Sequence, residues 1–199
     1  YYIIGTQLAE SGFDFFGGSG FDQPQDKKNP AAPNLYDLCE QNGYVLAGGY
    51  ADAKAKIGAQ KMLLVPAERL EDRSRHVGAL PYAIDRKIGD LSLPEIVEVA
   101  IAQLSTHDQF FMMAEGGKID YASHANDGGT VLREVLDFDD AIKVAYDFYM
   151  QHPDETLIVV TADHETGGMA LGNSDYTLNL KVLAEQKCSS DLLSDQLSA

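Results

Sequence analysis

Apolar residues follow two patterns in the second half of the chain, short continuous runs and longer stretches with helical spacing. The runs Phe110–Ala114 and Leu157–Thr161 have the length of strands, and their nearly continuous apolar character is typical of parallel strands covered on both faces. Between them, residues 129–151 place apolar side chains three and four positions apart, which predicts an amphipathic helix. Ser92 and Pro94 predict the start of an earlier helix, so this half should alternate helix, strand, helix and strand.

The first half shows the same alternation with shorter elements. We expect helices over residues 1–11, 35–41 and 51–57 and strands over residues 13–16, 44–47 and 61–65. Asn34 is the expected N-cap of the second of these helices. Alternating helices and strands predict an α/β protein, with three α/β/α layers and a mostly parallel sheet. Residues 68–90 are charged, irregular and interrupted by glycine and proline, so we expect a surface insertion there.

The length and net charge of the chain limit the number of domains and the classes of partner that we expect. A chain of 199 residues buries about 70% of the surface that its unfolded form exposes, so we expect one core and a single domain over residues 1–199. With 15 Lys and Arg against 31 Asp and Glu, the net charge is −16, which repels phosphate backbones. Because no basic stripe offsets that charge, we expect no nucleic-acid partner. The apolar runs fall far short of the roughly 20 residues of a membrane helix, so we expect no membrane span.

The start of the chain, the two cysteines and Ser19 give weaker indications of function. Position 1 is Tyr, and no basic stretch followed by an apolar one opens the chain, so we find no signal peptide in it and expect its start to be cut or processed. Cys39 and Cys188 have no Cys-x-x-Cys spacing, and free or buried thiols are favoured over a bridge. Ser19, in the glycine-rich stretch 17–20, lacks the Gly-x-Ser-x-Gly order of a nucleophile elbow, so a turn is favoured there.

Candidate chemistry collects just after the two predicted buried strands. In open α/β sheets, ligands bind outside the carboxyl ends of the strands. The first run leads to Glu115, Asp120 and His124, and the second leads to Asp163 and His164. Asp120 and His124 are four positions apart, which places them on one face of a helical turn. Carboxylate oxygen with imidazole nitrogen suits Zn²⁺, whereas Glu115 offers oxygen only and suits Mg²⁺.

A single Asp and His pair in a loop is more often a cap or a solvated group than a metal site. Two such pairs at equivalent strand ends reverse that preference. Carboxylates and imidazoles gathered without a cation would cost several kcal/mol in repulsion and desolvation, so a divalent metal is the natural compensation. We therefore expect the five side chains to converge at one edge of the sheet.

The stretch Phe110–Gly168 resembles alkaline phosphatases, in which one strand leads to Glu-Gly-Gly-x-Ile-Asp-x-x-x-His and a later one leads to Thr-Ala-Asp-His. The resemblance implies that Asp120 and His124 bind a first catalytic zinc, and that Asp163 and His164 bind a second. It also implies that Glu115 binds a magnesium ion. The implied cofactors are therefore two zinc ions and one magnesium ion, and the implied fold is an alkaline phosphatase-like α/β/α domain that this chain holds incompletely.

The implied activity is hydrolysis of phosphate monoesters through a phosphoseryl intermediate. The family's nucleophilic serine and phosphate-clamping arginine precede the matching stretch, and no His follows His164 to serve as the third zinc ligand. We therefore place no catalytic residue in this chain and expect these residues alone to be inactive. Uncovered strand edges would favour self-association, so a homodimer is also expected. The resemblance further implies a periplasmic or extracellular location.

Two other interpretations remain open. One is a different hydrolase of the same superfamily, such as a phosphodiesterase, a sulfatase or a phosphoglycerate mutase, which share the metal geometry but differ in the nucleophile. The other is a non-catalytic metal-binding or interaction module that keeps this part of the fold alone.

Overall fold

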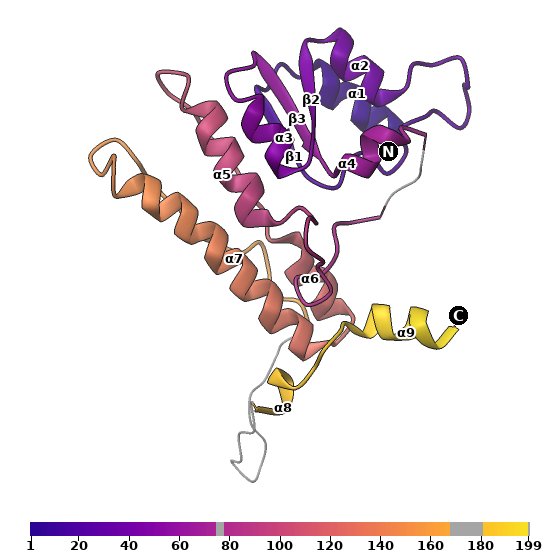
Figure 1. Cartoon of the computed structure of the whole chain (residues 1–199), viewed down its shortest axis with the longest axis vertical. Coiled ribbons are helices and arrows are strands. Elements are labelled where there is room, and N and C mark those ends of the chain that lie inside the picture. The colour runs from indigo at the N-terminus through magenta and orange to yellow at the C-terminus, as the bar shows by residue number, and fades with distance from the viewer. Residues whose placement is uncertain (75–77, 168–180, 199) are drawn as a thin grey trace. The chain divides into compact units, whose positions relative to one another are not determined.

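The computed structural model describes residues 1–74, 78–167 and 181–198. They belong to two compact units, one made of residues 1–80 and 89–113 and the other of residues 81–88 and 114–199 (Figure 1). Each unit is described by itself below. The single domain expected over residues 1–199 stays a prediction.

The first unit contains a three-stranded parallel sheet in the order β1-β3-β2. Its strands are β1 (Phe15–Gly17), β2 (Tyr44–Gly48) and β3 (Lys61–Val65). The central strand β3 pairs with both neighbours, and Leu63 lies opposite both Phe16 and Leu46. The three strands confirm the sequence-based expectation for this half, and the parallel pairing follows from the helices that connect them.

Helices cover both faces of this sheet, which gives the three predicted layers (Figure 1). The helices α1 (Tyr2–Glu10) and α2 (Leu35–Gln41) pack on one face, and α3 (Tyr50–Ala55) and α5 (Leu93–Leu104) pack on the other. A short helix, α4 (Ala67–Glu71), follows β3. The first face buries Ala9, Leu35, Tyr36, Cys39, Tyr44, Leu46, Leu63 and Val65, and the second buries Ala47, Ala53, Met62, Leu64, Ile96 and Val99. Alternate residues of β3 thus point into separate cores, as the pleat of a strand requires.

Side-chain caps set two of these helix starts. The Asn34 side chain accepts a hydrogen bond from the backbone N–H of Tyr36 at 3.0 Å, as its position before α2 predicts. Ser92 and Glu95 form a capping box at the start of α5, so the predicted start of that helix is confirmed. The chain bends at Gly18 and Ser19, where a turn was expected.

The second unit is helical in the residues described. It contains α6 (Gly117–His124), α7 (Gly128–Tyr149), α8 (Lys181–Ala184) and α9 (Ser190–Ser198). The α7 helix confirms the long amphipathic helix expected over residues 129–151. Helices α6 and α7 pack against each other, and Phe138 of α7 lies beside Gly116 at the start of α6.

Residues 81–88, expected within a surface insertion, are anchored to α7. Tyr82 is buried, and the backbone N–H of Ala83 donates to Glu134 at 2.5 Å. Arg86 forms a bidentate ion pair with Asp137 at 2.7 and 2.9 Å. The expected insertion therefore includes an anchored segment, while residues 75–77 lie outside the described residues.

The two predicted buried strands, Phe110–Ala114 and Leu157–Thr161, are not strands in the structure, and this part of the prediction is wrong. Both segments are largely exposed, with Phe111 and Leu157 each at 86%. A strand needs a hydrogen-bonded neighbour, and the structure pairs neither segment with a strand in the residues it describes. An apolar run favours burial, but it does not show whether another strand is available to pair with it.

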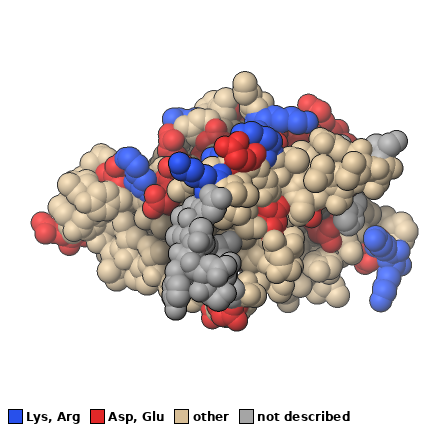
Figure 2. All heavy atoms as spheres, turned by 90° about the horizontal axis from the view of Figure 1, so that it is seen from below, with Lys and Arg blue, Asp and Glu red and all other residues tan. Residues whose placement is uncertain are grey.

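On the face drawn in Figure 2, acidic and basic side chains lie interspersed among uncharged ones.

Cys39 is buried and Cys188 half-buried, and both are free thiols, as the sequence favoured. Of the helices described, none combines the length and apolar character needed to span a bilayer.

Candidate functional site

The α6 helix brings the first predicted ligand pair together. Asp120 and His124 are one helical turn apart, with Asp120 Oδ1 3.5 Å from His124 Nε2. The imidazole is well exposed, and Asp120 is partly covered. Ser123, the serine of this helix, donates its hydroxyl to the carbonyl of Ile119 at 2.7 Å. The pair therefore follows from local helix geometry, and the Ser123 hydroxyl already has a partner.

The second predicted pair lies in an exposed, irregular segment. Asp163 Oδ2 is 3.4 Å from His164 Nε2, and Asp163 Oδ1 accepts a hydrogen bond from the backbone N–H of His164 at 2.9 Å. The carboxylate thus folds back onto the backbone and ring of the next residue. Because Asp163 and His164 are adjacent, their side chains can approach each other without a helix or strand to hold them.

The backbone fixes which nitrogen of His164 is available. Its Nδ1 lies 2.7 Å from the carbonyl oxygen of Glu165. A carbonyl oxygen can only accept, so Nδ1 carries the proton and Nε2 keeps its lone pair in the neutral ring. This contact, followed by the nearby charges of Asp163 and Asp120, raises the pKa of His164. Metal-binding histidines in proteins are commonly held in one tautomer in the same manner.

A hydroxyl joins the two segments. Thr166 donates to Asp120 Oδ1 at 2.7 Å, although the two residues are 46 positions apart. The same segment approaches the end of α6, where a Cβ placed on Gly167 would lie 3.8 Å from the Ser123 carbonyl oxygen. The structure therefore brings the two ligand pairs into one neighbourhood.

Glu115, the fifth predicted ligand, lies directly before the N-cap of α6. It is exposed, and its carboxylate lies beside Gly117 at the beginning of α6. Within the described part of the chain, Glu115 makes no hydrogen bond or ion pair with the other four predicted ligands. The described contacts thus link the two Asp and His pairs through Thr166 and do not include Glu115.

The spacing within each pair is that of two zinc ligands. Zinc bonds of about 2.0–2.1 Å at tetrahedral angles hold two ligand atoms roughly 3.3–3.4 Å apart. The observed separations are 3.5 Å for Asp120 with His124 and 3.4 Å for Asp163 with His164. Both exceed the usual 2.7–3.2 Å of an N–H···O hydrogen bond. Donor type and spacing therefore fit zinc at each pair.

The number of donors does not complete a site. No group of three or more His, Cys, Asp or Glu side chains in the described residues is placed to hold one ion. A catalytic zinc normally has three protein ligands. Each pair therefore supplies two donors, one fewer than such a site normally has.

Lys118, the lysine of the first motif, lies over an aromatic ring of the second unit. Its ammonium lies 3.5 Å from the centre of the Tyr82 ring. Burial lowers the pKa of Lys118, and the charges of Glu134, Asp191 and Asp85 oppose that shift. The side chain thus belongs to the packing of the second unit.

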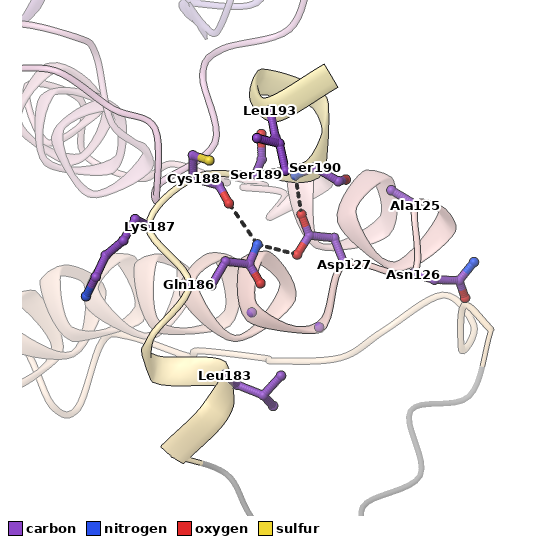
Figure 3. Close-up of a pocket in the computed structure, with 12 residues that line it drawn as sticks. Ala125, Asn126, Asp127, Leu183, Gln186, Lys187, Cys188, Ser189, Ser190 and Leu193 are labelled. Carbon is purple, nitrogen blue, oxygen red and sulfur yellow. Dashed lines mark hydrogen bonds between the residues drawn. The ribbon is translucent and has the colours of Figure 1, made fainter. Parts of the chain in front are cut away.

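A hollow of about 460 Å³ adjoins the start of α7, and none of the five predicted ligands lines it (Figure 3). Asp127 is 8% exposed there and accepts hydrogen bonds from Gln186 Nε2 at 2.6 Å and the Ser190 backbone N–H at 2.7 Å. It also caps α7 through the backbone N–H and hydroxyl of Thr130 at 3.2 and 2.8 Å. We call these contacts the Asp127 clasp, and they hold residues 186–190 against α7.

Sequence reasoning missed Thr166 and Asp127. Thr166 stands two positions after His164, where a hydroxyl beside a ligand motif is a signal for a supporting contact. Asp127, three positions before Thr130 at the start of an amphipathic stretch, fits the N-cap pattern. Neither signal identifies the distant partner of the residue.

Three comparisons agree on one family. Residues 76–195 match the family model described as alkaline phosphatase. Alkaline phosphatase 3 of Bacillus subtilis is 44% identical over 96 residues, which cover 48% of this chain and 21% of that protein. Repressible alkaline phosphatase of Saccharomyces cerevisiae is 37% identical over 132 residues, covering 59% of this chain and 23% of that protein.

A solved structure extends the likeness over the whole chain. The cold-active alkaline phosphatase of Shewanella sp. superposes with a TM-score of 0.81 at 28% identity, covering 100% of this chain and 46% of that one. The match thus spans about half of that solved chain and less than a quarter of each of the two curated relatives.

Proposed function

We propose that this chain, which belongs to the alkaline phosphatase family, is part of a metal-dependent hydrolase of phosphate monoesters. The observation that carries the proposal is the pair of Asp and His sites, each spaced like two zinc ligands and joined to the other by Thr166. The names of the similar proteins support phosphatase activity over the sulfatase and phosphodiesterase alternatives.

In this proposal, Asp120 and His124 hold one zinc ion and Asp163 and His164 hold a second. Bound cations would supply Lewis acidity that makes a hydroxyl more nucleophilic and stabilises the leaving oxygen of a phosphate ester. The Glu165 carbonyl keeps the proton of His164 on Nδ1, so Nε2 remains free to bind. The carboxylates of Asp120 and Asp163 bring negative charge that offsets the charge of the cations.

We assign a magnesium ion to Glu115, whose oxygen-only side chain suits that ion. Magnesium in this family is supported by one similar structure, a TAB5 alkaline phosphatase variant with magnesium bound in its M3 site. That chain superposes with a TM-score of 0.68 at 28% identity, covering 85% of this chain and 46% of its own. The other magnesium ligands are not assigned.

The chemical route is proposed to pass through a phosphoseryl intermediate. Formation of such an intermediate transfers the phosphoryl group to a serine oxygen and releases the alcohol, and water then releases phosphate. Ser123 is not proposed as that serine, because its hydroxyl is bonded to its own helix. No catalytic residue is assigned within these 199 residues.

We further propose that the 199 residues by themselves bind zinc poorly and do not hydrolyse phosphate esters. Each pair supplies two donors where a catalytic zinc normally has three. Calorimetric titration of zinc into the 199-residue chain, with an aryl phosphate assay alongside, tests this. Tight binding of two zinc ions with turnover would contradict it.

The location is proposed from the family, and the assembly from the uncovered strand edges expected from the sequence. We propose a periplasmic or extracellular enzyme that forms a homodimer. Cell fractionation and light scattering of the full-length protein test these two points separately.

The main experiment measures hydrolysis of an aryl phosphate by the full-length protein before chelation, after chelation and after zinc is restored. Activity should disappear with chelation and return with zinc. Asp120→Asn should lower activity strongly, whereas Asp147→Asn, a matched change at an exposed carboxylate on α7, should leave it unchanged. An aryl sulfate and a diaryl phosphate in parallel assays test the two alternative hydrolases. Activity that survives chelation, or an Asp120→Asn variant as active as the wild type, would reject the proposal.

A further inference from the structure

Thr166 occupies a position that the two ligand motifs do not explain. Its side chain is half-buried, and its hydroxyl donates to Asp120 Oδ1 at 2.7 Å. The accepting oxygen is the one that faces His124 Nε2 at 3.5 Å. The hydroxyl therefore acts on the atom that forms half of the first ligand pair.

We propose that Thr166 is a positioning residue that orients the Asp120 carboxylate for metal binding, an inference that rests on the proposed function. The terminal torsion of an Asp side chain is broad, so nothing in the side chain itself selects which oxygen faces His124. A carboxylate oxygen accepts through two lone pairs, and the Thr166 hydroxyl uses one of them. The other lone pair is thereby held toward the His124 ring.

The same hydrogen bond couples the two pairs. Thr166 lies three residues after Asp163 and two after His164 in an exposed segment. Its bond to Asp120 is the side-chain hydrogen bond that connects residues 163–167 to α6 in the described part of the chain. Losing the hydroxyl should therefore loosen both the Asp120 carboxylate and the placement of the second pair.

The test compares Thr166→Val, which removes the hydroxyl at nearly constant volume, with Thr166→Ser, which keeps it. Zinc affinity of the full-length protein is measured by competition with a chromophoric chelator, using zinc alone. Hydrogen bonds that support metal ligands are typically worth about 10–100-fold in affinity. Thr166→Val should therefore bind zinc about 10–100-fold less tightly, and Thr166→Ser should stay within about 3-fold of the wild type.

Controls separate this effect from loss of structure. Thr156→Val makes the same change at another half-buried threonine, outside both motifs, and should bind zinc like the wild type. Circular dichroism of the zinc-free variants checks that Thr166→Val is folded, and Thr166→Ala replaces it in the comparison if it is not.

Equal zinc affinity for Thr166→Val and the wild type would overturn the inference. So would a Thr166→Ser variant as impaired as Thr166→Val, because the hydroxyl would then not be the cause. A wild type that binds zinc without hydrolysing phosphate esters would reject the proposed function while the comparison of affinities still decides the role of Thr166. A wild type that binds no zinc would overturn both.

Discussion

Replacing Asp127 with alanine removes the acceptor at the centre of the clasp that holds residues 186–190 against α7 (Figure 3). The carboxylate receives four hydrogen bonds, two from Thr130 and one each from Gln186 and Ser190. Burial alone would raise the pKa of Asp127, but these hydrogen bonds outweigh burial and lower it. The ionised carboxylate is therefore the form that the folded protein stabilises.

The expected cost can be worked from these contacts. Loss of an Asp N-cap costs about 1 kcal/mol of helix stability. Hydrogen bonds to a charged group contribute about 1.5–3 kcal/mol each, and water can replace part of that for Ser190, which is exposed. With about 1 kcal/mol each for the contacts to Gln186 and Ser190 in addition to the cap, Asp127→Ala should cost about 3 kcal/mol. That is a large share of the 5–15 kcal/mol that stabilises a typical domain.

Hydrogen–deuterium exchange of residues 186–198, together with urea unfolding, measures this loss. Exchange in that segment should accelerate in Asp127→Ala and stay unchanged in Asp195→Ala, a control at an exposed Asp of α9. Asp127→Asn, which keeps one acceptor oxygen, should fall between the wild type and alanine. An Asp127→Ala protein with wild-type exchange and less than about 0.5 kcal/mol of destabilisation would refute this account of the clasp.

Three further outcomes follow from buried groups. Arg86→Ala leaves the largely buried carboxylate of Asp137 without its bidentate partner, so it should lower the free energy of unfolding by about 3 kcal/mol. The Arg86→Ala/Asp137→Ala double variant should lose less, because it leaves no unpaired carboxylate behind. Burial raises the pKa of Glu134 above its ordinary value of 4.5, so the carboxyl ionises at lower pH in the unfolded chain than in the folded one. Wild-type stability should therefore fall as the pH rises from 4.5 through the pKa of the folded protein. Glu134→Gln should lack that fall in urea titrations, and a parallel fall in both proteins would contradict the assignment. Burial raises the pKa of Cys39 to about 11, so thiol reagents at pH 8 should label it only on unfolding, and rapid labelling of the folded chain would contradict its burial.

Local patterns carried most of what the sequence predicted correctly. Asp120 and His124 meet because a helical turn separates them, and helix periodicity is visible in sequence. Asp163 and His164 meet because they are adjacent. Asn34 and Ser92 cap helices through contacts no more than three residues away.

The misses involve partners far along the chain. Thr166 meets Asp120 across 46 positions, and Gln186 meets Asp127 across 59. The wrong strand over Leu157–Thr161 has the same cause, because apolar character favours burial while a strand exists only when another strand is available to pair. Because Leu157–Thr161 is not a strand, the two ligand pairs do not meet at strand ends as expected. The Thr166 hydroxyl connects the second pair to Asp120 of α6 instead.

The order of strands in the first unit has a consequence for synthesis of the chain. The central strand, β3, is the last of the three to be made, and within the described residues β1 and β2 each pair with it and with no other strand. At roughly 5–20 residues per second, the ribosome takes on the order of 2–10 seconds to travel from Gly17 to Val65. During that interval β1 has no partner, and β2 has none from its own synthesis until β3 is made, so the apolar side chains of both strands are available to chaperones. Ribosomes that stall before residue 61 should therefore carry chains without this sheet.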